Sequence, residues 1–189
     1  MDLHRDIFQL IQSAETARAA AYTPYSHFTV GAALLCRRPE SAAAITSPDS
    51  VHSAEKSLTA ASVYADVLTA TSDPADALTA AAVSNTTVII TGCNIENKAY
   101  GSSMCAERTA VFKALSEGFS VFSAIAIVGG PEGQAPLDYC APCGACRQVL
   151  SEFAPPDFKV ILAKSESDYK IYTLAELLPE AFSFVRTDS

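Results

Sequence analysis

The hydrophobic residues of this chain recur at two spacings, one typical of amphipathic helices and one of buried strands. Apolar side chains at intervals of three and four positions predict a helix over residues 3–21, which Pro24 ends. Short apolar runs predict strands, and further helical stripes predict shorter helices. The strands are expected at residues 28–35, 88–91, 123–128 and 158–162, and the helices at residues 106–115, 146–153 and 173–178. Because strands alternate with helices, we expect a layered α/β domain with a mixed sheet.

Residues 37–86 differ from the rest of the chain in composition. They are rich in Ala, Ser and Thr, contain three prolines and have few large apolar side chains. We interpret them as a surface insertion between the first two strands of a single domain that spans residues 1–189. A regulatory or subunit-contact role for this segment is the alternative.

The charge balance argues against a nucleic acid polymer as partner. Thirteen Lys and Arg face 21 Asp and Glu, the net charge is −8, and the basic residues are scattered. Proteins that grip phosphate backbones normally show a basic face. The apolar runs are far shorter than the roughly 20 residues of a membrane-spanning helix, so we expect no membrane partner. Asp2 and Asp6 stand where a secretory signal would be basic, which favours a cytoplasmic protein.

The six cysteines suggest a metal or catalysis before disulfides. Cys105, Cys143 and Cys146 stand where loops enter predicted helices, and the last two share a face of a helical turn. Three protein ligands with an open fourth position are typical of catalytic zinc. A structural zinc site with Cys140 or Cys93 as fourth ligand stays possible, as does a pair of unliganded buried cysteines.

Two charged residues next to Cys105 fit catalytic zinc. Glu107 can shuttle a proton of a metal-activated water, although a glutamate in a first helical turn also simply favours the helix dipole. Cys105 must then lie at the helix start, because residues two apart inside a helix face apart. Three thiolates leave zinc with a net negative charge, which weakens its acidification of water. Arg108, our first choice, or Arg147 would offset this by donating to a sulfur. A solvated surface arginine fits the spacing equally well.

Four segments together resemble the small cytidine deaminases of free nucleoside salvage, which hold one zinc per subunit, and a fifth segment matches more weakly. They are YSHFTVGAALL (25–35), GCNIEN (92–97), CAERTA (105–110), PCGACRQVL (142–150) and, more weakly, LLPEAF (177–182). The resemblance covers residues 1–36 and 87–184. It implies a layered α/β/α domain with a mixed five-stranded sheet. It also implies hydrolytic deamination of cytidine and deoxycytidine to uridine and deoxyuridine plus ammonia, in pyrimidine salvage.

The resemblance further implies a reaction centre. Cys105, Cys143 and Cys146 would bind the zinc, and a zinc-bound hydroxide would attack C4 of cytosine. Glu107 would carry a proton to N3 of the base and then to the leaving amine.

The nucleoside contacts are implied in the same way. Phe28 would stack on the pyrimidine, Asn94 and Glu96 would hydrogen-bond the ribose 3′-hydroxyl, and the backbone at Ala106 would read the base edge. These residue types suit the roles, because an aromatic face holds a flat ring and a hydroxyl both donates and accepts. Taken alone, Phe28 could be a core strand residue, and Asn94 could shape a turn.

The family usually forms homotetramers, and Tyr100 and Phe182 match positions that reach a neighbouring subunit's site. The nearest alternatives are a deaminase of a cytosine nucleotide or of a nucleoside antibiotic. Polynucleotide deaminases typically begin their first metal motif with His, where this chain has Cys105. A non-catalytic zinc-binding protein would have no use for Glu107, Asn94 and Glu96.

Overall fold

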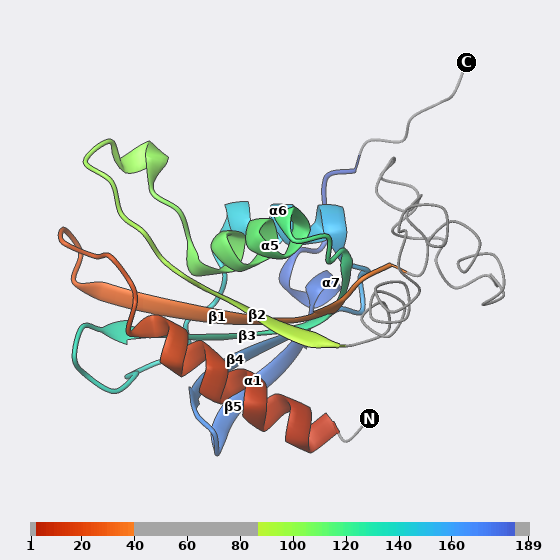
Figure 1. Ribbon diagram of the computed structural model, residues 1–189, viewed down its shortest axis with the longest axis horizontal. Coiled ribbons are helices and arrows are strands. Elements are labelled where there is room, and N and C mark those ends of the chain that lie inside the picture. Colours follow the sequence, from red (N-terminus) through yellow and green to blue (C-terminus); the bar gives the residue numbers. More distant parts are fainter. Residues whose placement is uncertain (1–2, 40–86, 184–189) are drawn as a thin grey trace, which may run out of the picture.

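The computed structural model describes residues 3–39 and 87–183 (Figure 1). They form one five-stranded sheet in the order β2-β1-β3-β4-β5. The strands are β1 (Phe28–Arg37), β2 (Val88–Cys93), β3 (Val121–Pro131), β4 (Lys159–Ser165) and β5 (Asp168–Thr173). Only the β3–β4 pair is parallel, so the sheet is mixed, as expected. Residues 40–86, nearly all of the expected insertion, lie outside the described residues.

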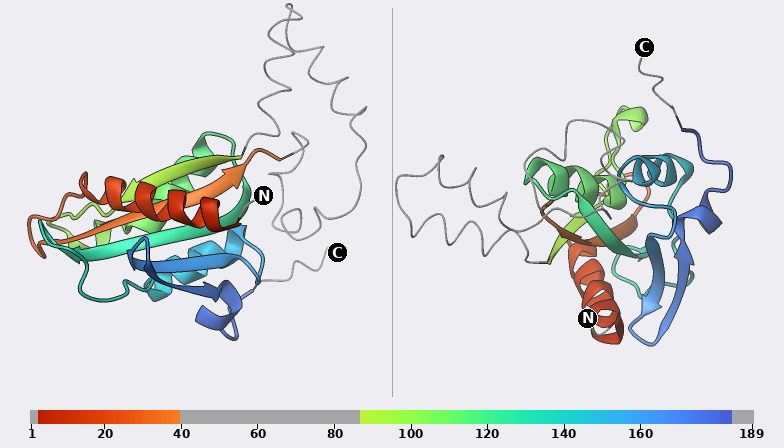
Figure 2. Two further views of the ribbon diagram at one scale, coloured as in Figure 1. Left: turned by 90° about the horizontal axis from the view of Figure 1, so that it is seen from below. Right: turned by 90° about the vertical axis from the view of Figure 1, so that its right-hand side faces the viewer.

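Helices cover both faces of this sheet. Helix α1 (Leu3–Arg18) lies on one face, and α5 (Ala106–Ser116) and α6 (Gly144–Phe153) lie on the other (Figure 2). The strand order explains why α5 and α6 share a face. Both connect parallel strands, β2 to β3 and β3 to β4, and both steps run in the same direction across the sheet. Because such crossovers are right-handed, their helices must lie on the same side.

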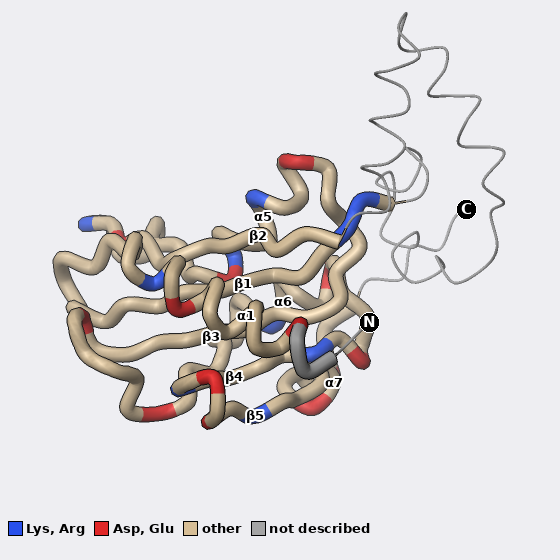
Figure 3. Tube along the Cα trace, turned by 60° about the horizontal axis from the view of Figure 1, so that its bottom comes forward, with Lys and Arg blue, Asp and Glu red and all other residues tan. Residues whose placement is uncertain are grey.

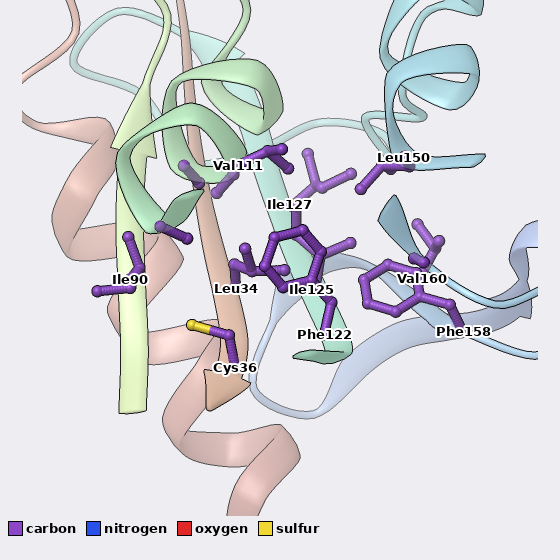
Figure 4. Close-up of a cluster of buried hydrophobic side chains, with 14 of the residues drawn as sticks. Leu34, Cys36, Ile90, Val111, Phe122, Ile125, Ile127, Leu150, Phe158 and Val160 are labelled. Atoms are coloured by element: carbon purple, nitrogen blue, oxygen red, sulfur yellow. The ribbon is translucent and has the colours of Figure 1, made fainter. Parts of the chain in front are cut away.

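Two buried apolar clusters fill the space between the layers. Successive side chains of β1 point to opposite faces. Leu34 and Cys36 join the larger cluster beneath α5 and α6 (Figure 4), whereas Ala33 and Leu35 join the smaller one beneath α1. A strand buried on both faces reads as a continuous apolar run, which is why the pattern predicted β1 and β3.

The pattern failed at two places. Strand β5 was not expected, because it is an edge strand with no fully buried residue and a largely polar sequence. Helix α1 ends at Arg18 and not at residue 21. The N–H groups of residues 19–21 bond three positions back, to the carbonyls of residues 16–18. This 3₁₀-type turn ends the helix well before Pro24.

Two small elements complete the described chain. A 3₁₀ turn, η2 (Tyr100–Ser102), precedes α5, and α7 (Leu174–Leu177) follows β5. Helix α7 begins with a capping box, in which the Thr173 side chain accepts from the N–H of Glu176 and the Glu176 carboxylate accepts from the N–H of Thr173. This cap accounts for the short helix that the sequence predicted there.

Charged residues are dispersed over the described chain, with basic and acidic positions interspersed along the trace (Figure 3). This agrees with the absence of a basic cluster in the sequence. Within residues 3–39 and 87–183, no helix has the length and apolar character needed to cross a bilayer.

The pairing of β1 with β2 predicts the effect of deleting most of the insertion. The two strands are antiparallel neighbours that pair from Gly31–Cys93 to Cys36–Val88, so the strand ends that flank the segment lie side by side. We expect a chain lacking residues 40–82, with a short linker, to fold with its sheet intact. Closing a shorter loop costs less entropy, by roughly 0.6 kcal/mol per halving of its length. Circular dichroism and thermal unfolding would check this. Aggregation of the shortened chain would instead assign the segment to the core or to an interface.

Candidate metal centre and active site

Two helix N-termini bring three cysteines together above one face of the sheet. Cys105 is the N-cap residue of α5 and Cys143 the N-cap residue of α6, both with extended backbones. Cys146 lies in the first turn of α6 and is buried. The free N–H groups and the dipole at a helix N-terminus stabilise thiolates. The cysteine segments therefore start at the helix ends that favour ionised sulfur.

The geometry of these sulfurs fits a tetrahedral zinc ion. The Sγ atoms of Cys105 and Cys143 lie 3.8 Å apart, those of Cys143 and Cys146 lie 3.5 Å apart, and all three lie within 4.8 Å of one another. Sulfurs bound at about 2.3 Å in a tetrahedron lie about 3.8 Å apart. In the described part of the chain, no other group of three His, Cys, Asp or Glu residues could hold a metal.

The two candidates for a fourth sulfur ligand are not part of this group. The Cys93 thiol donates to the carbonyl of Ala20 at 3.3 Å. The Cys140 side chain packs against the backbone of Gly129, where an added Cβ would come within 2.6 Å of its sulfur. Burial raises the pKa of the Cys140 thiol to about 11. Three protein ligands with an open fourth position are typical of catalytic zinc.

Of the two candidate arginines, Arg108 reaches a sulfur. Its Nη2 donates to Cys105 Sγ and to the carbonyl of Ser103, each at 3.4 Å. Hydrogen bonds from Cys146 and then from Arg108 lower the pKa of the Cys105 thiol. Arg147 instead donates to the carbonyls of Pro142 and Leu177, at 2.8 and 2.7 Å. Arg147 thereby ties the start of α6 to the end of α7.

Glu107 lies in the first turn of α5, next to the sulfurs, and its side chain is only 5% exposed. Burial raises the pKa of this carboxyl to about 7, and the nearby charge of Cys105 adds to the rise. A glutamate that only favoured the helix dipole would be expected at the surface. A carboxyl with a pKa near neutrality suits a general acid and base.

The expected nucleoside contacts gather where β1 begins and β2 ends. The Phe28 ring is 41% exposed and so is not a core residue. The Asn94 amide donates to the carbonyl of Phe28 at 2.9 Å and accepts from the N–H of Val30 at 2.8 Å. Glu96 is buried and accepts with Oε2 from the N–H groups of Tyr25 and Ser26, at 3.0 and 3.2 Å. Hydrogen bonding by Ser26 lowers the pKa of the Glu96 carboxyl.

The remaining expected site residues lie in two different settings. Ala106 is buried as the first residue of α5, so its N–H lies outside the hydrogen-bond ladder of the helix. Tyr100 and Phe182 are 70% and 75% exposed. The segments that carry them lie on opposite sides of α5 and α6 (Figure 1), so one chain does not bring these two aromatic residues together.

The structure adds one cluster that the sequence did not indicate. The Tyr139 hydroxyl donates to Asp168, and Lys164 Nζ lies 2.7 Å from the same carboxylate. The bond from Tyr139 to Asp168 joins the segment just before Cys143 to the β4–β5 hairpin. The hydroxyl and carboxylate stand 29 positions apart, and no local spacing relates a loop residue to an edge strand.

Three comparisons relate the chain to known proteins. The model of the family described as the cytidine and deoxycytidylate deaminase zinc-binding region matches residues 52–162. A cytidine deaminase of Sporosarcina psychrophila is 36% identical over 178 residues, which cover 94% of this chain and 92% of that protein. One of Halalkalibacterium halodurans is 37% identical over 174 residues, or 92% of each. The solved cytidine deaminase from Burkholderia pseudomallei is 34% identical with a TM-score of 0.60, covering 92% of this chain and 97% of that one.

The position of α5 over the sheet depends on a close backbone approach at Gly92. A Cβ there would lie 2.5 Å from the nitrogen of Ala110 and 2.6 Å from the oxygen of Ala106, both backbone atoms of α5. Neither atom can move unless the helix moves. Because Cys105 caps this helix, displacement of α5 also displaces one of the three sulfurs.

We therefore expect Gly92→Ala to lower both thermal stability and metal affinity, since overpacking typically costs about 1–3 kcal/mol. Thermal unfolding and competition with a chromophoric zinc chelator would measure the two effects. Gly101→Ala is the matched control, because a Cβ at Gly101 would meet nothing within 4 Å. Equal zinc affinity in both variants would show that α5 keeps its place without the contact.

Proposed function

Because the chain belongs to the cytidine and deoxycytidylate deaminase family, we propose that Cys105, Cys143, Cys146 and Glu107 form its reaction centre. The protein is a zinc-dependent hydrolase that deaminates cytidine, and the resemblance in the sequence is confirmed. One observation supports this proposal most directly. The three sulfurs lie within 4.8 Å of one another, and the buried Glu107 lies beside them.

Cys105, Cys143 and Cys146 would hold the zinc. When bound, zinc would supply an acidified water as the nucleophile for C4 of the base. Arg108 donates to Cys105 Sγ and so reduces the negative charge that this sulfur gives to the metal. The bonds from Arg147 to the carbonyls of Pro142 and Leu177 hold the segment just before Cys143 in place.

Glu107 moves the proton. As a carboxylate it would accept a proton from the attacking water, and as an acid it would donate this proton to N3 of the base. It would then accept the second proton, from the hydroxyl now on C4, and donate it to the amine, which leaves as ammonia while the C4 carbonyl forms. Since burial brings its pKa to about 7, both forms are accessible near neutral pH.

The substrate is a small nucleoside, and we propose cytidine and deoxycytidine. Phe28 stacks on the pyrimidine, the backbone at Ala106 reads the base edge, and Asn94 and Glu96 contact the 3′-hydroxyl. Two observations support this assignment. The ring of Phe28 is exposed where β1 begins, and the carboxylate of Glu96 is buried just after β2 ends.

We also propose a single cytidine deaminase domain over residues 1–189, with residues 37–86 as an insertion, in a cytoplasmic homotetramer. Thiols that must stay reduced to bind zinc favour the cytoplasm. Tyr100 and Phe182 are large aromatic residues exposed on the isolated subunit, as residues that complete a neighbouring site would be.

We expect Glu107→Gln to fold, keep its zinc and lose at least about 10²–10⁴-fold in turnover of cytidine, because proton transfer contributes that much. Uridine and ammonia production, with zinc content measured in parallel, would check this. Cys143→Ala is the companion variant, since it should lose the metal as well as the activity.

Near-normal turnover by Glu107→Gln would remove this residue from the mechanism. The parent protein should also be assayed with deoxycytidine, cytidine monophosphate and a cytosine nucleoside antibiotic. A strong preference for either of the last two would replace the proposed substrate, and zinc retention with no deamination would indicate a binding protein.

Shared sites predict complementation between inactive subunits. We expect Glu107→Gln and Phe182→Ala to be nearly inactive alone, yet to regain deaminase activity when co-refolded. A mixed tetramer then contains sites with an intact Glu107 from one chain and an intact Phe182 from the other. Glu107→Gln mixed with Cys143→Ala is the control, because both defects affect the subunit's own site. Light scattering should give four times the subunit mass, and a monomeric active parent would contradict the shared site.

A further inference from the structure

Strand β2 ends earlier than β1 and β3 at the edge of the site. Its pairing with β1 stops at Cys93, opposite Gly31. On the other side, β3 continues to pair with β1 as far as Phe28, opposite Pro131. The stretch 28–30, which presents the Phe28 ring, therefore lies beyond the last paired residue of β2.

Asn94, the next residue after β2, covers this stretch with three hydrogen bonds. Its backbone N–H donates to the carbonyl of Val30 at 3.1 Å. Its side chain accepts from the N–H of Val30 at 2.8 Å and donates to the carbonyl of Phe28 at 2.9 Å. A side-chain amide carries the same donor and acceptor as a peptide group. Asn94 thus extends the hydrogen-bond ladder of β2 with its side chain in place of further strand.

We infer that Asn94 is a positioning residue for Phe28, and that this role is separate from any contact with the sugar. The inference rests on the proposed function of Phe28 as the base-stacking residue. The amide fixes the carbonyl of Phe28 and the N–H of Val30, and so sets the direction in which the Phe28 side chain leaves the strand.

The hydrogen-bonding capacity of the neighbouring groups fits two separate roles. The Asn94 amide has one further N–H and one further lone pair beyond the two backbone bonds. Glu96 accepts with Oε2 from the N–H groups of Tyr25 and Ser26, and a carboxylate has further lone pairs that can accept from a sugar hydroxyl. A ligand without that hydroxyl still needs the Phe28 ring in place.

The experiment compares two substrates that differ only in the presence of the 3′-hydroxyl of the sugar. We measure kcat/KM of the parent and of Asn94→Ala on deoxycytidine and on 2′,3′-dideoxycytidine. We expect the substitution to cost at least about tenfold on both, since small misplacements of a substrate-positioning group have effects of up to about 10²-fold. If the loss disappears on dideoxycytidine, Asn94 acts only through the hydroxyl and the inference is wrong.

A double-mutant cycle with Phe28→Ala tests whether Asn94 acts through the ring. We expect Asn94→Ala to cost much less in the Phe28→Ala background than in the parent, because residues that act as a unit are not additive. Full additivity of the two losses would overturn the inference. Inactivity of the parent on every cytosine nucleoside would instead count against the proposed function.

Hydrogen exchange provides a readout without substrate. The N–H of Val30 should exchange faster in Asn94→Ala, whereas that of Leu34, which lies within the β1–β2 pairing, should not change. Unchanged exchange at Val30 in folded Asn94→Ala would show that the amide does not hold the strand end. If Asn94→Ala fails to fold, Asn94→Asp serves in the two kinetic measurements, because a carboxylate keeps the acceptor for Val30 but loses the donor to Phe28.

Discussion

Three cysteine sulfurs lie within 4.8 Å of one another because two helix N-termini converge above one face of the sheet. This convergence is a constraint on the whole domain. Both α5 and α6 must lie on the same side, and α5 must approach β2 closely enough that only glycine fits at position 92. The right-handed crossovers from β2 to β3 and from β3 to β4 place both helices on that side. The sheet order thereby determines that the metal ligands can meet.

The chemistry of the site follows from burial at this convergence. Glu107 and Arg108 are neighbours of Cys105 in the chain, yet the fold separates their environments. The carboxyl of Glu107 is withdrawn from water, which brings its pKa to about 7, while Arg108 donates to the Cys105 sulfur. The same first turn of α5 therefore supplies a proton carrier and a charge partner for the metal. The place where β1 begins and β2 ends is built differently, because there side chains bond the backbone. Asn94 bonds Phe28 and Val30, and Glu96 accepts from the N–H of Tyr25.

Much of the fold and of the metal site could be predicted from patterns between residues close together in the chain. The Cys143–Cys146 spacing fits one helical turn, and fully buried strands read as apolar runs, so these features could be found without a structure. Strand β5 was not predicted, because an edge strand with a polar sequence has neither a helical spacing nor a continuous apolar run. The end of α1 was misplaced because the 3₁₀-type bonds of residues 19–21 leave no mark in the hydrophobic spacing.

The sequence by itself determined the residue types, their local spacing and the family, because these depend on neighbours along the chain. It left open whether Arg108 or Arg147 meets a sulfur, whether Phe28 is a core residue and what Asn94 contacts. Only the tertiary structure decided these points. The distance between Arg108 and the sulfurs, the exposure of Phe28 and the side-chain bonds of Asn94 depend on segments brought together from as many as 66 positions apart. Such contacts are set by the packing of helices and strands on the sheet, which local spacing does not encode.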